Sequence, residues 1–278
     1  MCYAPDAAPP PDDRSDAAVS AAPLTLTSAD GTSFAAFLAR PREQSEERPD
    51  SQSGDHAPST SGVGVVVLPD LRGLHGFYQR LAERLAGRGY TAMAIDYYGR
   101  TAGTSNRDDG FPFMEHAMKL NRDALQDDLA TAIGYLRGDD GGGCRAVLAL
   151  GFCFGGRQAF FASAPRFGLA GVIGFYGAPG LAGPYGPGPA QHAAELAAPI
   201  LALFGGADEG IPASAVAEFD QALSAVGVEH EIVSYPGAPH GFFDVKQEQH
   251  AEASADAWQR VLGFLQTRSL AGNQERNR

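Results

Sequence analysis

Three residues of the types needed for nucleophilic catalysis each follow an apolar segment of the chain: Cys153, Asp208 and His240. The cysteine stands in the motif Gly151-Phe-Cys-Phe-Gly-Gly156, between an apolar run of strand length and a segment of helical spacing. Strand, tight turn and helix in this order are typical of a nucleophile elbow, with cysteine where serine is more usual. At the N-terminus of a helix a thiolate is stabilised, and backbone N–H groups can hold an oxyanion. We therefore expect Cys153 to be a nucleophile; the alternative is a buried structural cysteine.

A nucleophile needs a base, and the base needs a group that orients it. Asp208 ends the segment Gly205-Gly-Ala-Asp, and His240 follows the next apolar segment. The order nucleophile, acid, histidine is that of folds built around an elbow. Considered singly, Asp208 is equally explained as a helix N-cap and His240 as a turn histidine. Together with the elbow, they predict a Cys153–His240–Asp208 triad.

Apolar strands and amphipathic helices alternate along most of the chain. We predict strands at 63–68, 91–95, 146–150, 171–175, 200–204 and 231–234, helices at 77–87, 115–137, 155–162, 213–226 and 248–266, and a hairpin of 24–28 and 33–40 around Asp30-Gly31. This alternation implies an α/β fold with a mostly parallel central sheet of about eight strands and helices on both faces. Ligands of such sheets bind at the carboxyl ends of the strands, which is where the three candidate residues fall.

The composition favours one folded domain flanked by two tails. Residues 1–23 are rich in Ala, Pro and Asp and predict a disordered N-terminal tail, and 268–278 predict a disordered C-terminal tail. Residues 24–267 form the expected domain, with a flexible polar insertion at 42–61. Deleting the N-terminal tail or the insertion should change the free energy of unfolding little.

The charge pattern excludes several classes of partner. The formal net charge is −12, so we expect binding neither to nucleic acid nor to an anionic membrane. The chain has no apolar run long enough to span a bilayer and no signal-peptide pattern at its start. Its three cysteines cannot form a closed disulfide framework, so a cytoplasmic location is the simplest interpretation.

The remaining cysteines and histidines have weaker support for a functional role. Cys144 starts a strand and is expected to be inert, whereas His75 lies close enough to the expected oxyanion loop to line the pocket. The histidines show no metal-ligand spacing, and Gly62-Val-Gly64 precedes a strand rather than following one, so it is no phosphate loop. We expect no cofactor and no metal.

The sequence resembles the dienelactone hydrolases (carboxymethylenebutenolidases) of the α/β-hydrolase fold from about residue 24 to 267. The resemblance rests on the cysteine elbow with the later Asp208 and His240, on Val65-Val-Val-Leu-Pro-Asp-Leu-Arg-Gly73, and on Gly89-Tyr-Thr-Ala-Met-Ala-Ile-Asp-Tyr-Tyr-Gly-Arg100. It implies Cys153 as nucleophile, His240 as base and Asp208 as orienting acid. It also implies an oxyanion hole formed by the backbone N–H groups of Leu71 and Phe154.

Two positions depart from the family pattern. The family has a glutamate in the oxyanion loop that interacts with the resting thiol, and this chain has the shorter Asp70 there. The family also holds the substrate carboxylate with two arginines. Arg100 matches the first, but Asp244 stands at the position of the second, and Arg72 could compensate. We therefore expect a weaker preference for carboxylate-bearing lactones than two arginines would give.

The sequence thus predicts a hydrolase that opens lactones or small esters through a thioester intermediate. A thioesterase or a general small-ester esterase on the same fold is one alternative. A non-catalytic thiol redox sensor is the other, although a sensor needs neither Asp208 nor His240. The expected partner is a small lactone or ester, and the expected assembly is a monomer or a small homo-oligomer.

Overall fold

An eight-stranded sheet forms the centre of the computed structural model, which describes residues 8–10, 18–42, 62–107, 110–181, 186–244 and 247–274. The strands are β1 (Val19–Thr27), β2 (Ser33–Pro41), β3 (Val63–Leu68), β4 (Thr91–Ile95), β5 (Ala146–Phe152), β6 (Gly171–Phe175), β7 (Ile200–Gly205) and β8 (His230–Tyr235). They lie in the order β1-β2-β4-β3-β5-β6-β7-β8. The β1–β2 hairpin pairs antiparallel, as does β2 with β4, and all other neighbours pair parallel. The predicted mostly parallel sheet is confirmed.

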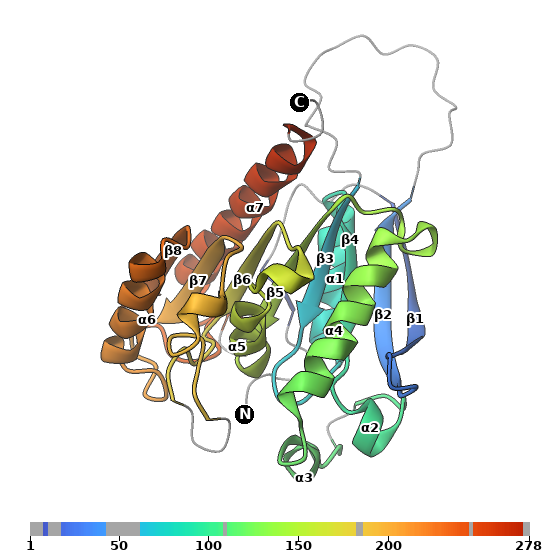
Figure 1. Ribbon diagram of the computed structural model, residues 1–278, viewed down its shortest axis with the longest axis horizontal. Coiled ribbons are helices and arrows are strands. Elements are labelled where there is room, and N and C mark those ends of the chain that lie inside the picture. The colour runs from blue at the N-terminus through green and yellow to red at the C-terminus, as the bar shows by residue number, and fades with distance from the viewer. Residues whose placement is uncertain are drawn as a thin grey trace.

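The helices cover both faces of this sheet (Figure 1). The α-helices are α1 (Gly76–Gly87), α2 (Gly99–Ala102), α3 (Phe113–Ala117), α4 (Arg122–Arg137), α5 (Phe154–Phe161), α6 (Ala213–Val226) and α7 (Ala251–Gln274); short 3₁₀ turns are η1 (Asp139–Gly141), η2 (Pro165–Phe167) and η4 (Ala193–Glu195). In Figure 1, α4 and α5 lie in front of the sheet, and α1 and α7 lie behind it. Strands β3, β5, β6 and β7 are buried along their whole length because helices cover both of their faces.

The long helix predicted at 115–137 is wrong, because the structure divides this segment into α3 and α4. Asn121 causes the break: its backbone is extended, and its side-chain Oδ1 accepts hydrogen bonds from the N–H groups of Asp123 and Ala124. An asparagine used in this way is an N-cap, so a new helix begins at Arg122. The break leaves α3 below the carboxyl ends of the strands (Figure 1).

The chain ends also differ from the prediction. Strand β1 begins at Val19, inside the segment assigned to a disordered tail, and pairs with β2 from its first residue. Residues 8–10 lie against α1, where the Arg84 guanidinium donates a hydrogen bond to the carbonyl of Pro10. At the other end, α7 continues to Gln274 rather than ending at 266. Most of the predicted insertion, residues 43–61, lies outside the described residues.

Within the described part of the chain, no helix is both long enough and apolar enough to cross a membrane.

Candidate active site

Cys153 occupies the sharp turn between β5 and α5. Its backbone has φ 54° and ψ −114°, and a positive φ is rare for a residue with a side chain. Its N–H donates to the carbonyl of Phe175 at 3.0 Å, and its own carbonyl accepts from Arg157 at 3.1 Å. Strain held in place by such bonds is common at functional sites. The turn has the geometry of the predicted elbow, and the side chain of Cys153 is half-buried.

Two glycines make this turn possible. A Cβ at Gly151 would lie 2.0 Å from the carbonyl oxygen of Gly155, so the chain could not fold back on itself there. A Cβ at Gly155 would lie 2.2 Å from the carbonyl oxygen of Leu68 and 2.3 Å from that of Pro69. The glycine at 155 therefore lets the start of α5 approach the loop that follows β3.

Asp208 and His240 meet beyond the ends of β7 and β8. Nδ1 of His240 lies 2.6 Å from Oδ2 of Asp208, whose other oxygen accepts from the N–H of Gly210 at 2.9 Å. Burial opposes ionisation of Asp208, but the hydrogen bonds from His240 and Gly210 hold the pKa of this carboxyl below its usual value. The structure thus gives His240 an ionised partner on one ring nitrogen and leaves its side chain 32% exposed.

A second residue with a strained backbone packs against His240. Tyr176 has φ 36°, and it follows β6 directly beside the elbow, since Phe152 pairs with Phe175. Its ring centroid lies 4.8 Å from that of His240, and its hydroxyl donates to the buried carboxylate of Asp244 at 3.0 Å. Sequence reasoning missed Tyr176; its place just past a strand's carboxyl end was the available signal.

The two predicted oxyanion donors, Leu71 and Phe154, lie at equivalent positions after the neighbouring strands β3 and β5. Leu68 pairs with Gly151 in the parallel β3–β5 ladder. Leu71 and Phe154 each lie three residues beyond this pair, one in the loop after β3 and the other at the first position of α5. N–H groups in the first turn of a helix point out of its N-terminus, so Phe154 directs a donor toward this edge of the sheet.

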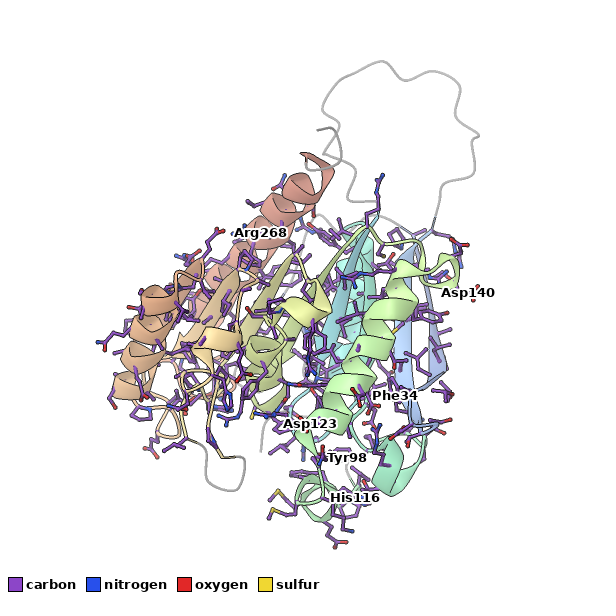
Figure 2. All side chains as sticks on the ribbon, in the orientation of Figure 1. Phe34, Tyr98, His116, Asp123, Asp140 and Arg268 are labelled. Carbon is purple, nitrogen blue, oxygen red and sulfur yellow. The ribbon has the colours of Figure 1, made fainter. Side chains whose placement is uncertain are left out.

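Three tyrosine hydroxyls hold the loop that carries Leu71. Tyr78 Oη accepts from the N–H of Asp70 at 2.9 Å, Tyr97 Oη donates to the carbonyl of Pro69 at 2.8 Å, and Tyr98 Oη donates to the carbonyl of Leu71. All three rings are buried, and the ring of Tyr98 contacts that of His116 below the sheet (Figure 2). Sequence reasoning missed these bonds, although Tyr97 and Tyr98 follow a strand.

Asp70, Arg72 and His75 lie in the same loop. Asp70 is fully buried; Oδ1 accepts from the N–H of Arg72 at 2.8 Å and lies 3.7 Å from Nε2 of His75, while Oδ2 has no hydrogen-bond partner among the described residues. Burial lowers the pKa of His75, which therefore stays neutral at pH 7. The Arg72 guanidinium lies 5.7 Å from the ring centroid of Phe113.

Arg100 is engaged by two carboxylates. Nε and Nη2 donate to Oδ2 of Asp30 at 3.0 and 2.9 Å, and Nη1 donates to Oδ2 of Asp128 at 2.5 Å. These bonds tie α2 to the β1–β2 turn and to α4. All three nitrogens of the Arg100 guanidinium thus have hydrogen-bond partners within the protein. The predicted role of Arg100 in binding a substrate carboxylate stays a prediction.

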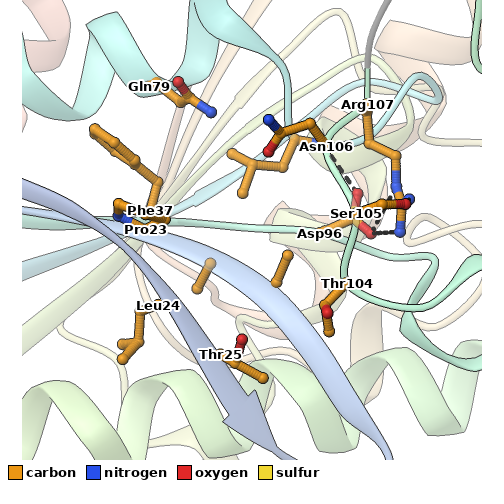
Figure 3. Close-up of a pocket in the computed structure, with 13 residues that line it drawn as sticks. Pro23, Leu24, Thr25, Phe37, Gln79, Asp96, Thr104, Ser105, Asn106 and Arg107 are labelled. Atoms are coloured by element: carbon orange, nitrogen blue, oxygen red, sulfur yellow. Dashed lines mark hydrogen bonds and ion pairs between the residues drawn. The ribbon is translucent and has the colours of Figure 1, made fainter.

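A buried ion pair braces the adjoining loops. Oδ2 of Asp96 accepts from Nη2 of Arg107 at 2.9 Å, and the same carboxylate accepts from the N–H groups of Leu74 and Tyr98. Figure 3 shows this pair at the wall of a cavity of about 240 Å³ between the hairpin strands and the segment 104–107. Both charges are partnered, so the ion pair holds the loops after β3 and β4 against the segment 104–107.

No group of three or more His, Cys, Asp or Glu side chains that could hold a metal ion exists among the residues the structure describes.

The fold and this site define the class of the protein: an α/β hydrolase with an elbow after its fifth strand. The family model described as the dienelactone hydrolase family matches residues 54–269, and the chain belongs to this family. The resemblance inferred from the sequence is therefore confirmed.

Known relatives agree with this assignment. Two proteins named "Putative carboxymethylenebutenolidase" are similar to this chain: that of Yersinia pestis is 34% identical over 72% of this chain and 76% of the relative, and that of Synechocystis is 33% identical over 73% and 85%. The crystal structure of a "Putative Dienelactone Hydrolase" from Klebsiella pneumoniae superposes with a TM-score of 0.73 at 29% identity, covering 89% of this chain and 98% of that one. The chain is thus an ester-hydrolysing enzyme acting on lactone or ester substrates.

Proposed function

We propose that the enzyme opens lactones or small esters by covalent catalysis, with Cys153 as nucleophile, His240 as base and Asp208 as the acid that orients it. The observation that carries the proposal is the 2.6 Å hydrogen bond between His240 and Asp208, which lies at the edge of the sheet where the turn holds Cys153 at φ 54°. A carboxylate bonded to Nδ1 fixes the tautomer that leaves Nε2 able to accept a proton.

In the proposed reaction, His240 takes the thiol proton and Cys153 attacks the carbonyl carbon. The N–H groups of Leu71 and Phe154 hold the resulting oxyanion, each worth roughly 3–4 kcal/mol in comparable sites. The carbon–oxygen bond of the ester breaks, and His240 returns the proton to the leaving alkoxide. Water then loses a proton to His240 and hydrolyses the thioester, which regenerates the thiol.

The nature of the nucleophile favours substrates with good leaving groups. A thiolate is itself readily expelled from the tetrahedral intermediate. When the substrate has a poor leaving group, the intermediate therefore returns to substrate rather than going on to the thioester. Enol lactones and activated esters should therefore react faster than amides. The proposed interaction of Asp70 with the thiol and the binding of a substrate carboxylate by Arg100 or Arg72 belong to this same hypothesis.

The test compares two cysteine variants. Cys153→Ala should abolish hydrolysis of p-nitrophenyl acetate and of cis- and trans-dienelactone, whereas Cys144→Ala, which alters a buried thiol, should retain it. Full activity in Cys153→Ala would exclude the covalent mechanism. Turnover of an acyl-CoA but of neither lactone would favour the thioesterase alternative, and reversible oxidation of Cys153 without any hydrolysis would favour the redox sensor.

A further inference from the structure

The ring of His240 has more freedom than its bond to Asp208 can remove. That hydrogen bond holds Nδ1 at 2.6 Å from Oδ2 of Asp208, but a ring held at one atom can still pivot about it. The side chain of His240 is also 32% exposed, so part of it meets solvent rather than protein. A second contact must limit the pivot if Nε2 is to point steadily at the thiol of Cys153.

The ring of Tyr176 supplies a contact of this kind. Its centroid lies 4.8 Å from that of the His240 ring, at an interplanar angle of 54°. Tyr176 is fully buried, and its ring also packs against the rings of Phe175 and Phe242, at 5.9 and 5.7 Å. A side chain packed on several sides cannot move aside, so the imidazole lies on a rigid surface.

The backbone of Tyr176 has a strained conformation. Its φ of 36° is rare for a residue with a side chain, and its N–H donates to the carbonyl of Leu203 at 2.7 Å. The next residue is Gly177, where a Cβ would lie 2.4 Å from the backbone nitrogen of Arg157 in α5. The loop after β6 thus turns sharply against the helix that follows Cys153. Strain of this kind is common where function requires a fixed geometry.

The hydroxyl of Tyr176 bonds to the same loop that carries His240. It donates at 3.0 Å to Oδ2 of Asp244, which lies four residues after the histidine. Asp244 is 2% exposed, and a carboxylate so deeply buried is unfavourable to the fold unless it accepts hydrogen bonds. Tyr176 therefore contacts this loop twice, through its ring at His240 and through its hydroxyl at Asp244.

Other bonds hold the backbone of this loop. The carbonyl of Ala238 accepts from the N–H of Ala207 at 2.9 Å. The carbonyl of Phe242 accepts from Oγ of Ser254 in α7 at 2.7 Å. These two bonds lie on either side of His240 in the sequence. Loss of the tyrosine hydroxyl should therefore leave the loop folded and change the orientation of a side chain rather than the path of the backbone.

We propose that Asp244 and Tyr176 are a pair of positioning residues for the base: the bond between them fixes the tyrosine ring, and the ring fixes the plane of the His240 imidazole. This inference rests on the proposed function, because it takes His240 to be the base. The pair acts through the direction of Nε2 and not through contact with the substrate. Its loss should therefore lower kcat without raising KM.

The first test compares two tyrosine hydroxyls that each donate to an aspartate. Tyr176→Phe should lower kcat for p-nitrophenyl acetate about tenfold and change KM less than twofold, because a small misalignment of the base slows the reaction. The matched control is Tyr235→Phe: Tyr235 is 8% exposed, and its hydroxyl donates at 2.8 Å to Asp256 of α7, outside the His240 loop. The control should change kcat less than twofold. Equal losses of kcat in the two variants, or a rise in KM alone in Tyr176→Phe, would overturn the proposal.

A double-mutant cycle tests whether the two residues act together. Asp244→Ala should lower kcat as much as Tyr176→Phe does, whereas Asp244→Asn keeps an oxygen acceptor for the hydroxyl and should stay within threefold of the wild type. The double variant Tyr176→Phe/Asp244→Ala should be no slower than either single variant, since both changes remove one interaction. Losses that multiply to about a hundredfold, or an equal loss in Asp244→Asn and Asp244→Ala, contradict the proposal.

Proton NMR separates this inference from the proposed function, because it requires no hydrolysis. The proton on Nδ1 of His240, held in the 2.6 Å bond to Asp208, should give a resonance far downfield that is identified by its loss in His240→Gln. It should broaden in Tyr176→Phe, where a more mobile ring exchanges this proton with water faster, and stay sharp in Tyr235→Phe. An unchanged resonance in Tyr176→Phe refutes the positioning pair even if Cys153→Ala is inactive. Full activity in His240→Gln would instead refute the base itself.

Discussion

Two aspartate–histidine pairs lie at the same edge of the sheet, and they differ in distance and in exposure. Asp208 and His240 are 2.6 Å apart, and the His240 side chain is 32% exposed. Asp70 and His75 are 3.7 Å apart, which is longer than an ordinary hydrogen bond, and both are almost fully buried. A histidine serves well as a base when a hydrogen-bond acceptor on one ring nitrogen fixes its tautomer and a substrate can reach the other nitrogen. The comparison therefore favours the proposed catalytic role for the first pair, and it predicts that the second pair contributes less to the reaction rate.

The largest expected effect separates the two histidines. His240→Gln should lower kcat for p-nitrophenyl acetate about 10⁶-fold, because loss of the base in a catalytic triad has an effect of this order. His75→Gln should lower it less than tenfold, since His75 is buried away from solvent. Steady-state kinetics of both variants check the comparison, and comparable losses in the two would show that His75 belongs to the catalytic centre.

Substitution of Asp208 should likewise lower the rate more than substitution of Asp70. Asp208→Asn should lower kcat about 10⁴-fold, because an amide favours the wrong tautomer of His240. In Asp70→Asn the backbone N–H of Arg72 still meets an oxygen acceptor, so we expect kcat to fall less than tenfold. Single-turnover measurements would isolate the acylation step. A loss in Asp70→Asn as great as in Asp208→Asn would contradict this expectation and would show that the proposed interaction of Asp70 with the thiol is essential for catalysis.

A smaller effect is expected from the tyrosines that hold the oxyanion loop. Tyr97→Phe removes the hydroxyl that bonds to the carbonyl of Pro69. We expect kcat to fall about tenfold, equivalent to about 1.4 kcal/mol, while KM changes less than twofold. Tyr90→Phe is the matched control, because Tyr90 is also buried but lies before β4, far along the strand from this loop. If KM rises while kcat stays constant in Tyr97→Phe, the loop positions substrate rather than the oxyanion.

The smallest effect concerns stability and pH. Burial lowers the pKa of His75 in the folded protein below its usual 6.5, so the unfolded chain binds more protons as pH falls. His75 therefore favours folding fully above pH 6.5, and this contribution is lost as pH falls toward the lowered value. Urea denaturation at a series of pH values should show a shallower decline below pH 6.5 in His75→Gln than in the wild type. Parallel curves for the two proteins would exclude the titration of His75 as a cause.

Much of the fold could be predicted because it depends on local pattern. The bounds predicted for β3, β4 and β6 agree with the structure, since an apolar run bounded by turn residues marks a buried strand. The predicted helix at 115–137 is wrong because Asn121 caps a new helix inside a segment of continuous apolar spacing. The strand predicted to begin at Leu24 begins at Val19 instead. The five residues 19–23 show no alternation of apolar and polar side chains, so the sequence pattern did not indicate that they pair with β2.

The sequence by itself determined the strand–turn–helix around Cys153, the order of the three candidate catalytic residues and the membership of the family. Only the tertiary structure decided the partners of the polar groups. In the structure, His240 is hydrogen-bonded to Asp208, although each could have been an isolated loop residue. Arg100 is hydrogen-bonded to Asp30 and Asp128. The physical reason is separation along the chain. Backbone conformation follows from neighbouring residues, whereas the distance between side chains from different loops is set by sheet register and by the packing of the helices.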